Sequence, residues 1–227
     1  MQQVLAICLD LDDTLWAIDQ VIERAELAML EWLARDYPRV TEAHDVHSMR
    51  AVRQRMVAEF PAMRHDFTFL RRQALAWHAR EAGYPEQLAD QAFEVFYAAR
   101  NQVEVFADVV PALERLRTRF RLMTLSNGNA DLGRIGLAHY FERTLAARDA
   151  GAAKPDRRIF QALLEGAKLA PAQVLYVGDD PQADVGGARG AGLHTAWVDR
   201  FGRSWPPGVQ PADLSVSDLG ELADRLL

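Results

Sequence analysis

The stretch VLAICLDLDD, residues 4–13, decides the fold of this chain. Its apolar first half is typical of a buried strand, and its acidic second half is typical of a strand end that opens into a site. Residues 17–100 then carry apolar side chains three and four apart, with proline and glycine breaks, which predicts four helices and no strand. A helical block therefore separates the first strand from the rest of any sheet.

After residue 105 the sequence alternates between strand and helix patterns, which is typical of a parallel sheet covered by helices. The predicted strands are 120–126, 143–148, 173–179, 194–198 and a short one near 214. The predicted helices are 109–118, 156–168, 182–190 and 218–226. We expect an α/β fold with a Rossmann-like core, formed by residues 1–15 and 106–227. Residues 16–105 are predicted to be an inserted helical domain, with a site between the two.

The composition of the 227 residues is that of an ordinary globular protein, with 49 % hydrophobic and 26 % charged residues. The net charge of −6 disfavours a large basic surface for nucleic acid or anionic lipid. Apolar runs such as VLAICL fall short of the ~20 residues of a membrane span, and the first ten residues lack a basic signal-peptide region. The single cysteine, Cys8, fits a reducing compartment. We expect a cytoplasmic protein without a nucleic-acid or membrane partner.

Polar side chains follow the predicted strands of the α/β part. The first strand is followed by Asp10, Asp12, Asp13 and Thr14. The strand 120–126 ends with Ser126 and is followed by Asn127, and the strand 173–179 ends with Asp179 and is followed by Asp180. Because ligands bind at the carboxyl ends of parallel strands, we expect these clusters to converge. So many carboxylates in one place need a cation, and Mg²⁺ is the usual one where phosphate also binds. Taken one at a time, these acids could instead be turn or helix-cap residues.

Four short motifs carry a family resemblance: DLDDT at 10–14, LSNGN at 125–129, Lys154 before Pro155, and GDDPQAD at 178–184. In order and spacing they resemble the motifs of the haloacid dehalogenase-like hydrolase superfamily, and the resemblance covers the whole chain. The helical insertion after the first motif resembles the cap domain of one group in that superfamily, the domain that sets substrate specificity.

The resemblance implies a role for each matching residue. Asp10 is the expected nucleophile, which forms an aspartyl phosphate, and Asp12 is the expected general acid and then general base. Mg²⁺ is expected on the Asp10 carboxylate, the Asp12 backbone carbonyl and Asp179. Asp180 and Asp184 are either further ligands of the metal or partners of its ligands, and the sequence leaves both open.

The remaining motif residues are expected to bind the substrate phosphate. Ser126 and Asn127 would donate hydrogen bonds to phosphate oxygens, and Thr14 is assigned to the same group. Lys154 would neutralise charge that the metal leaves uncovered. Lys154 and Lys168 are the two lysines among 26 basic residues, so a lysine at this place indicates a need for a compact charge.

Asp12 favours the phosphatase branch over the dehalogenases, because a halide leaving group needs no proton donor. We therefore expect a phosphoric monoester hydrolase. Two alternatives remain: a phosphomutase that uses the same acid pair, and a protein that binds a phosphorylated ligand without catalysis.

The inserted segment bears on the substrate. Residues 50–80 carry seven arginines against Glu59 and Asp66, which suits an anionic substrate, although a solvated helix face would look the same. The stretch RHDFTFLR at 64–71 is expected to face the site, with Arg64 and His65 as substrate contacts. Trp16 could stack on a planar substrate group or pack at the hinge between the domains.

Within the superfamily, the chain resembles bacterial phosphatases of flavin mononucleotide and of the phosphorylated ribitylamino-uracil intermediate of riboflavin biosynthesis. The residues that carry this are DLDDTLW at 10–16, SNGNA at 126–130 and VGDDPQADVGGARGAG at 177–192. The expected substrate is a small phosphorylated metabolite, with nucleotides and sugar phosphates as alternatives. The sequence leaves open whether the protein is a monomer or a homodimer.

Overall fold

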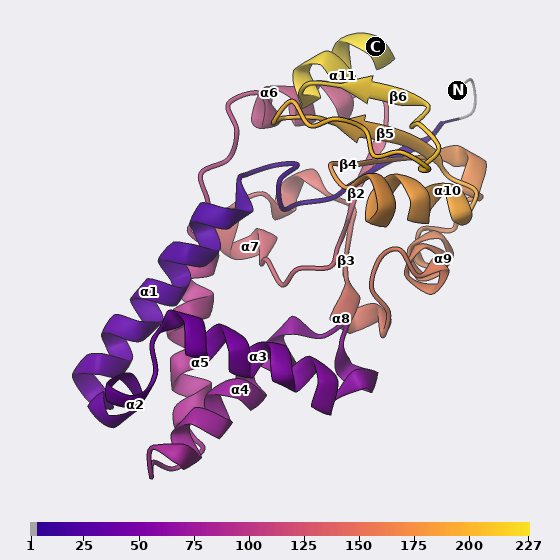
Figure 1. The fold of residues 1–227 in the computed structure, drawn as a ribbon. Helices are drawn as coiled ribbons and strands as arrows, with labels where there is room; N and C mark the ends of the chain where they lie inside the picture. Colours follow the sequence, from indigo (N-terminus) through magenta and orange to yellow (C-terminus); the bar gives the residue numbers. More distant parts are fainter. Residues whose placement is uncertain (1–3) are drawn as a thin grey trace. The chain divides into compact units, whose positions relative to one another are not determined.

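A computed structural model describes residues 4–227 of the chain, which form two compact units (Figure 1). The first, here called the sheet unit, contains the residues up to Ala17 together with Glu104–Leu227. The second, here called the helical unit, is Ile18–Val103. The chain thus leaves the sheet unit after its first strand and returns to it 86 residues later, because the helical unit spans 18 to 103.

The sheet unit is built on six parallel strands in the order β3-β2-β1-β4-β5-β6. The strands are β1 (Ala6–Leu9), β2 (Arg121–Ser126), β3 (Arg143–Ala146), β4 (Val174–Gly178), β5 (His194–Val198) and β6 (Leu214–Val216). The first strand lies in the middle, where Ala6 pairs with Arg121 on one side and with Val174 on the other. The predicted α/β class with a parallel Rossmann-like sheet is confirmed.

Helices cover both faces of this sheet, with α6 and α11 on one face and α9 and α10 on the other (Figure 1). The α-helices of the unit are α6 (Val109–Leu116), α7 (Leu132–Ile135), α8 (Ala147–Ala150), α9 (Arg157–Ala167), α10 (Gly187–Gly190) and α11 (Leu219–Leu226). Alternate residues of β1 point to opposite faces. Ala6 and Cys8 pack with Phe160 and Leu163 of α9, and every residue of β1 is buried, as its unbroken apolar sequence requires.

The predicted helix 182–190 is divided in the structure. Residues Pro181–Gly186 form a π-helical turn, η4, and α10 follows from Gly187. Asp180 precedes the turn and its side chain accepts hydrogen bonds from the backbone N–H groups of Gln182 and Ala183. Single π-helical turns are rare and occur often at functional sites.

The helical unit contains five α-helices and a short 3₁₀ turn, η1 (Pro61–Met63). The helices are α1 (Ile18–Asp36), α2 (Pro38–Ala43), α3 (Val46–Glu59), α4 (Phe67–Glu81) and α5 (Leu88–Arg100). The sequence pattern missed α2, because six residues are too few to show helical periodicity. Pro38, one of the prolines expected to break the helices, occupies the first turn of α2, where proline is tolerated.

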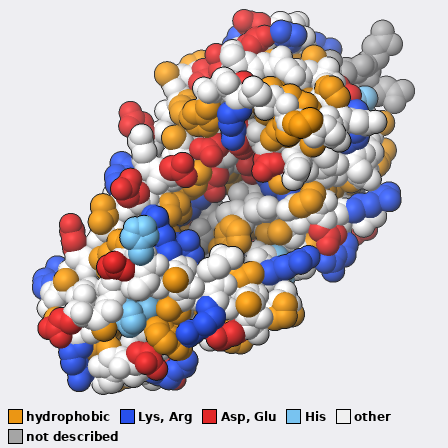
Figure 2. All heavy atoms as spheres, in the orientation of Figure 1, with side chains coloured by type: hydrophobic (Ala, Val, Ile, Leu, Met, Phe, Trp, Pro, Cys, Tyr) orange, Lys and Arg blue, Asp and Glu red, His pale blue; other side chains and the backbone are white. Residues whose placement is uncertain are grey.

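None of the described helices combines the length and the apolarity that crossing a bilayer demands. On the face of the molecule drawn in Figure 2, acidic and basic side chains are interspersed over both units. That mixture agrees with the moderate net charge of −6.

Candidate active site

The candidate site lies where β1, β2 and β4 end at the same edge of the sheet. Asp10 follows β1, Ser126 is the last residue of β2, and Asp179 follows β4. The backbone N–H of Asp10 donates to the carbonyl of Val177 at 2.8 Å, which extends the pairing of β1 and β4 up to the site. Asp10, Ser126 and Asp179 are all buried.

Lys154 joins the carboxylates of this edge. Its Nζ donates to Oδ1 of Asp10 at 2.6 Å, to Oδ1 of Asp184 at 2.7 Å and to the hydroxyl of Tyr176 at 2.9 Å. These three partners match the three donors of an ammonium group. A planar guanidinium has no such three-way geometry around one atom, which explains a lysine in a chain that otherwise favours arginine.

Tyr176 is a site residue that the sequence did not reveal. Its hydroxyl accepts from Lys154 and lies 3.0 Å from the carbonyl oxygen of Leu125 and 3.2 Å from Oδ1 of Asp184, either of which can accept its proton. In the sequence it is one more β-favouring residue within the strand QVLYVGD, so no local signal separates it from its core neighbours. Its role depends on where Lys154 lies, 22 residues away.

Burial and charge set the protonation tendencies of the cluster. Burial raises the pKa of Asp10 well above its usual range, an effect that the Lys154 charge opposes. Burial alone would lower the pKa of Lys154, but the carboxylates of Asp10 and Asp184 reverse this and raise it. Lys154 therefore stays charged at neutral pH. Its charge favours the ionised form of Asp10, the form a nucleophile needs.

Asp179 is held by one residue of β5 and one of the segment that follows β5. Its Oδ2 accepts from Nη2 of Arg203 at 2.8 Å, and its backbone carbonyl accepts from the indole N–H of Trp197 at 2.8 Å. Burial raises the pKa of Asp179 to about 6 despite the hydrogen bond from Arg203. No sequence pattern singles out Arg203, which lies in a long segment between β5 and β6.

The residues present fit a divalent cation. Asp10, Asp179 and Asp184 each offer a carboxylate oxygen, and the three atoms lie within 4.8 Å of one another. Oxygen ligands in this number suit Mg²⁺, which usually keeps water and substrate oxygens in its remaining positions. Three buried carboxylates face two cationic side chains, Lys154 and Arg203, so the cluster keeps a net negative charge that would attract a cation.

Trp16 contacts the expected general acid, Asp12. The ring is fully buried, and its Nε1 donates to Oδ1 of Asp12 at 2.9 Å. A buried ring presents no exposed face, which fits the packing alternative, and stacking on a substrate stays a prediction. Trp16 orients the carboxyl group of Asp12. The tight turn that brings the two together includes Asp13 with a φ of 58°.

Asn127 connects two of the predicted motifs. Its Oδ1 accepts from the backbone N–H of Lys154 at 2.7 Å, and its Nδ2 donates to the backbone carbonyl of Lys154 at 3.1 Å. Both polar atoms of the side chain thus fix the segment that carries the lysine. Ser126 Oγ accepts from the N–H of Gly128 at 2.9 Å. Their predicted contacts with phosphate stay predictions.

Asp180 and Asp184 have different surroundings. Asp180 is exposed and begins the π-helical turn, whereas Asp184 is fully buried and belongs to the carboxylate cluster. Asp184 Oδ2 accepts from the backbone N–H of Asp180 at 3.0 Å. Gly178 permits this approach, because a Cβ at that position would lie 2.2 Å from Oδ2 of Asp184.

The last predicted contacts are a threonine in the sheet unit and two residues of the helical unit. The hydroxyl of Thr14 is buried without a hydrogen-bond partner within residues 4–227, and its carbonyl accepts from Nε of Arg200 at 2.7 Å. Arg64 and His65 lie in the turn between η1 and α4, where Arg64 is exposed and His65 is half-buried. A substrate role for these three residues stays a prediction.

Comparison with known proteins agrees with this arrangement. A family model of haloacid dehalogenase-like hydrolases matches residues 4–192. A phosphoserine phosphatase of Thermus thermophilus is 38 % identical over 148 residues, which are 63 % of this chain and 59 % of that enzyme. The match therefore spans less than two thirds of that relative's length.

Two further proteins match over nearly their full length. The 5-amino-6-(5-phospho-D-ribitylamino)uracil phosphatase YigB of Escherichia coli is 28 % identical over 99 % of this chain and 97 % of its own. The crystal structure of a 2-haloacid dehalogenase from Pseudomonas syringae has a TM-score of 0.92 and 37 % identity, and the match covers 97 % of each chain.

Proposed function

This chain belongs to the haloacid dehalogenase-like hydrolase family, and from that premise we propose that it hydrolyses phosphate monoesters. The observation that carries the proposal is the contact of Lys154 with Asp10, at 2.6 Å in a buried carboxylate cluster, with Asp12 two residues further on. Phosphatases among the relatives support the same reaction.

In the first proposed step, Asp10 attacks the phosphorus atom of the substrate. Lys154 occupies Oδ1 of Asp10, which leaves Oδ2 as the attacking oxygen. The new bond joins Oδ2 to phosphorus as the bond from phosphorus to the ester oxygen breaks. Asp12 donates its proton to that ester oxygen, so the alcohol leaves neutral. The hydrogen bond from Trp16 keeps the Asp12 carboxyl group in one orientation for this transfer.

In the second step, water hydrolyses the aspartyl phosphate. Asp12, now ionised, takes a proton from the water as the water oxygen bonds to phosphorus. The bond between Asp10 and phosphorus breaks, inorganic phosphate leaves, and Asp12 is protonated again. Asn127 contributes by fixing the backbone of Lys154, whose charge faces the developing negative charge.

Magnesium fits this scheme through the chemistry of its donors. The residues proposed to hold it are Asp10 and Asp179 through their carboxylates and Asp12 through its backbone carbonyl, with Asp184 beside them. When bound, Mg²⁺ supplies a Lewis acid that polarises the phosphoryl group and offsets its charge. Arg203 would have to yield its contact with Oδ2 of Asp179 if that oxygen becomes a ligand.

Dehalogenation is a second candidate, because the 2-haloacid dehalogenase of Pseudomonas syringae is 37 % identical across the chain. That reaction also begins with attack by a carboxylate such as Asp10, but it releases a halide, which needs no proton. Asp12, oriented by Trp16, has a task in phosphate transfer and none in halide release. The hydrogen-bonded Asp12 therefore favours the phosphatase.

For the substrate, we propose flavin mononucleotide or the ribitylamino-uracil phosphate of riboflavin biosynthesis, which would place the enzyme in the cytoplasm. The match to YigB over nearly the whole chain supports this class. A pyrimidine 5'-nucleotidase of Escherichia coli, 28 % identical over 96 % of the chain, makes nucleoside monophosphates the next class to test. The helical unit, residues 18–103, is the proposed specificity cap.

The test is phosphate release by the purified protein with Mg²⁺. The panel contains flavin mononucleotide, ribitylamino-uracil phosphate, nucleoside monophosphates and sugar phosphates, and a parallel assay follows halide release from 2-chloropropionate. We expect phosphate release that Asp10→Asn and chelation abolish. Asp12→Asn should lower it by about 10²–10⁴-fold. Asp149→Asn, which changes an exposed acid that pairs with Arg148, is the matched control.

Three results would contradict the proposal. Full phosphate turnover in Asp10→Asn would remove the nucleophile assignment. Halide release without phosphate release, unaffected by Asp12→Asn, would establish the dehalogenase instead. A rearranged sugar phosphate in place of free phosphate would establish a mutase.

A further inference from the structure

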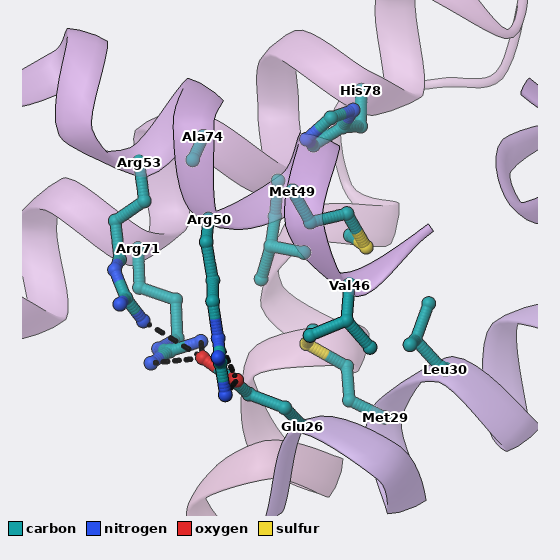
Figure 3. Close-up of a pocket in the computed structure, with 11 residues that line it drawn as sticks. Glu26, Met29, Leu30, Val46, Met49, Arg50, Arg53, Arg71, Ala74 and His78 are labelled. Atoms are coloured by element: carbon teal, nitrogen blue, oxygen red, sulfur yellow. Dashed lines mark hydrogen bonds and ion pairs between the residues drawn. The ribbon is translucent and has the colours of Figure 1, made fainter. Parts of the chain in front are cut away.

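The helical unit contains a small cavity of its own, between α1, α3 and α4, that opens to solvent. Its lining has a charged part and an apolar part (Figure 3). Arginine and glutamate side chains gather at one end, and apolar side chains such as Met29, Val46 and Met49 form the wall beyond them. Small-molecule sites typically combine an apolar wall with a few placed polar groups.

The charged end is built around Glu26, whose side chain is 5 % exposed. Oε2 of Glu26 lies 2.6 Å from Nη2 of Arg50, and Oε1 lies 3.0 Å from Nη1 of Arg53. Arg71 approaches the same Oε1 from α4 (Figure 3). Three guanidinium groups thus face one carboxylate, and the cluster keeps two positive charges in excess. One of these charges balances the carboxylate of Glu26, and an anion could pair with the other two.

Arg71 is the least well paired of the three. Both of its contacts with Glu26 are 3.5 Å long, beyond the usual 2.7–3.2 Å of an N–H···O hydrogen bond. Its side chain is 11 % exposed and lies over the ring of Phe96, 3.5 Å from the centroid. Burial, and after it the charge of Arg53, lowers the pKa of Arg71 to about 9, although the carboxylate of Glu26 acts in the opposite direction.

His78 lines another part of the cavity wall, away from the arginines in Figure 3. The residue is 1 % exposed, and neither ring nitrogen has a hydrogen-bond partner among the described residues. Burial, with the nearby His44 and Arg55, lowers its pKa to about 4, so the ring is neutral and offers one donor and one acceptor. A buried polar group without a partner is costly, and a ligand or water in the cavity would satisfy it.

We propose that this cavity is a binding site for a small organic anion. Its phosphate or carboxylate group would pair with Arg71 and Arg53 in competition with Glu26, its body would lie along Met49 and Val46, and a hydroxyl or amide would reach His78. The lining of this site shares no residue with the carboxylate cluster of the sheet unit, and anion binding does not depend on the proposed phosphatase activity; only its assignment to a group of the substrate rests on that function. The anion is either a free metabolite or a second charged group of the substrate.

The test uses phenylphosphonate, which has an anionic head and an apolar body and contains no ester bond to hydrolyse. The full-length protein, free of metal, is titrated while NMR follows the Nε–H signal of Arg71 and the ring nitrogens of His78. We expect both sets of signals to shift along one saturable curve. Inorganic phosphate should shift the Arg71 signal alone and bind more weakly, since it lacks the apolar body.

Variants separate this site from any other that binds the probe. Arg71→Gln should weaken the binding that His78 reports by at least about tenfold, as expected for a lost hydrogen bond to a charged group. Glu26→Gln removes the competing carboxylate and should tighten it several-fold. Arg35→Gln is the control, because Arg35 lies on α1 outside the cavity lining and pairs with Asp36. If Glu26→Gln is unstable, the melting temperature is compared in place of the affinity. The probe should then raise the melting temperature of Glu26→Gln by more than it raises that of the wild type.

Unmoved signals of Arg71 and His78 at saturating probe would overturn the proposal, and so would equal binding by the wild type and Arg71→Gln. Where binding is found, steady-state kinetics of Arg71→Gln identify the source of the anion. A raised KM with little change in kcat assigns the site to a second charged group of the substrate. An unchanged KM assigns it to a separate metabolite.

Discussion

Removing the hydroxyl of Tyr176 tests the buried network around Lys154 with a single atom. Tyr176→Phe keeps the ring that packs against Phe160 and removes the group that lies 2.9 Å from Lys154 Nζ and 3.0 Å from the carbonyl of Leu125. Both partners are deep in the sheet unit, so water would have no easy access to replace the hydroxyl. The ammonium of Lys154 would keep two of its three partners.

The expected cost follows from these contacts. A hydrogen bond to a charged group contributes about 1.5–3 kcal/mol, and leaving a buried partner unsatisfied costs about 1–3 kcal/mol. Because the two figures describe overlapping effects, we expect the free energy of unfolding to fall by about 2–3 kcal/mol. A less firmly held Lys154 should lower kcat by about tenfold, which corresponds to 1.4 kcal/mol. KM should change less, since the tyrosine itself is too deeply buried to contact substrate.

The assay is urea unfolding followed by tryptophan fluorescence, alongside steady-state turnover of the best substrate. Tyr84→Phe is the matched control, because that hydroxyl has no hydrogen-bond partner among the described residues while its ring contacts Tyr37 and Arg39. The control should change stability by less than about 0.5 kcal/mol. If Tyr176→Phe behaves like the control in both measurements, the network around Lys154 does not act as described.

Three other predictions concern different parts of the molecule. His78 has an ordinary pKa of 6.5 and a pKa of about 4 in the folded protein, so between these pH values the unfolded chain binds a proton that the folded protein does not. The free energy of unfolding should therefore fall by up to about 3 kcal/mol as the pH drops through that window. Unfolding at pH 7 and at pH 4 measures this difference, and His78→Gln should reduce it. Gly178→Ala should displace Asp184, because the new Cβ would lie 2.2 Å from Oδ2 of Asp184. We expect the free energy of unfolding to fall by about 2 kcal/mol or more and the activity to be lost. Gly190→Ala is the control and should be tolerated, because a Cβ there has nothing within 4 Å. Arg203→Gln should tighten Mg²⁺ binding by about threefold in isothermal titration calorimetry. The reason is that the metal would no longer compete with the half-exposed ion pair of Arg203 and Asp179, which is worth up to about 1 kcal/mol. Unchanged affinity would show that Arg203 does not compete with the metal.

The sequence alone predicted the fold class and most of the strands and helices, because each depends on local periodicity. The run VLAICL gave a strand buried on both faces, and the structure places it as β1 in the middle of the sheet. Local patterns failed where an element was short, as for α2, or where helix geometry changed, as in the π-helical turn after Asp180. Periodicity is detected over several helical turns, so it reveals neither a very short helix nor a change of helix type within one turn.

The sequence also singled out Asp10, Lys154, Asp179 and Asp184 through their motifs, and the structure brings these four side chains into one buried cluster. It left stacking and packing open for Trp16, since an aromatic side chain next to a motif gives no indication of whether its ring is buried or free; the structure buries the ring and bonds it to Asp12. It assigned Asn127 to phosphate, and the structure shows that both polar atoms of that side chain bind the backbone of Lys154.

Tertiary structure decided which partners surround each of these groups. Contacts with residues 22 to 45 positions away in the chain define the roles of Tyr176, Arg203 and the cluster around Glu26. Hydrophobic periodicity and turn chemistry act between near neighbours and can be read from the sequence. The pKa of a buried group and the pairing of its charge depend instead on distances of a few ångströms across the fold, and these exist only once the strands and helices have packed.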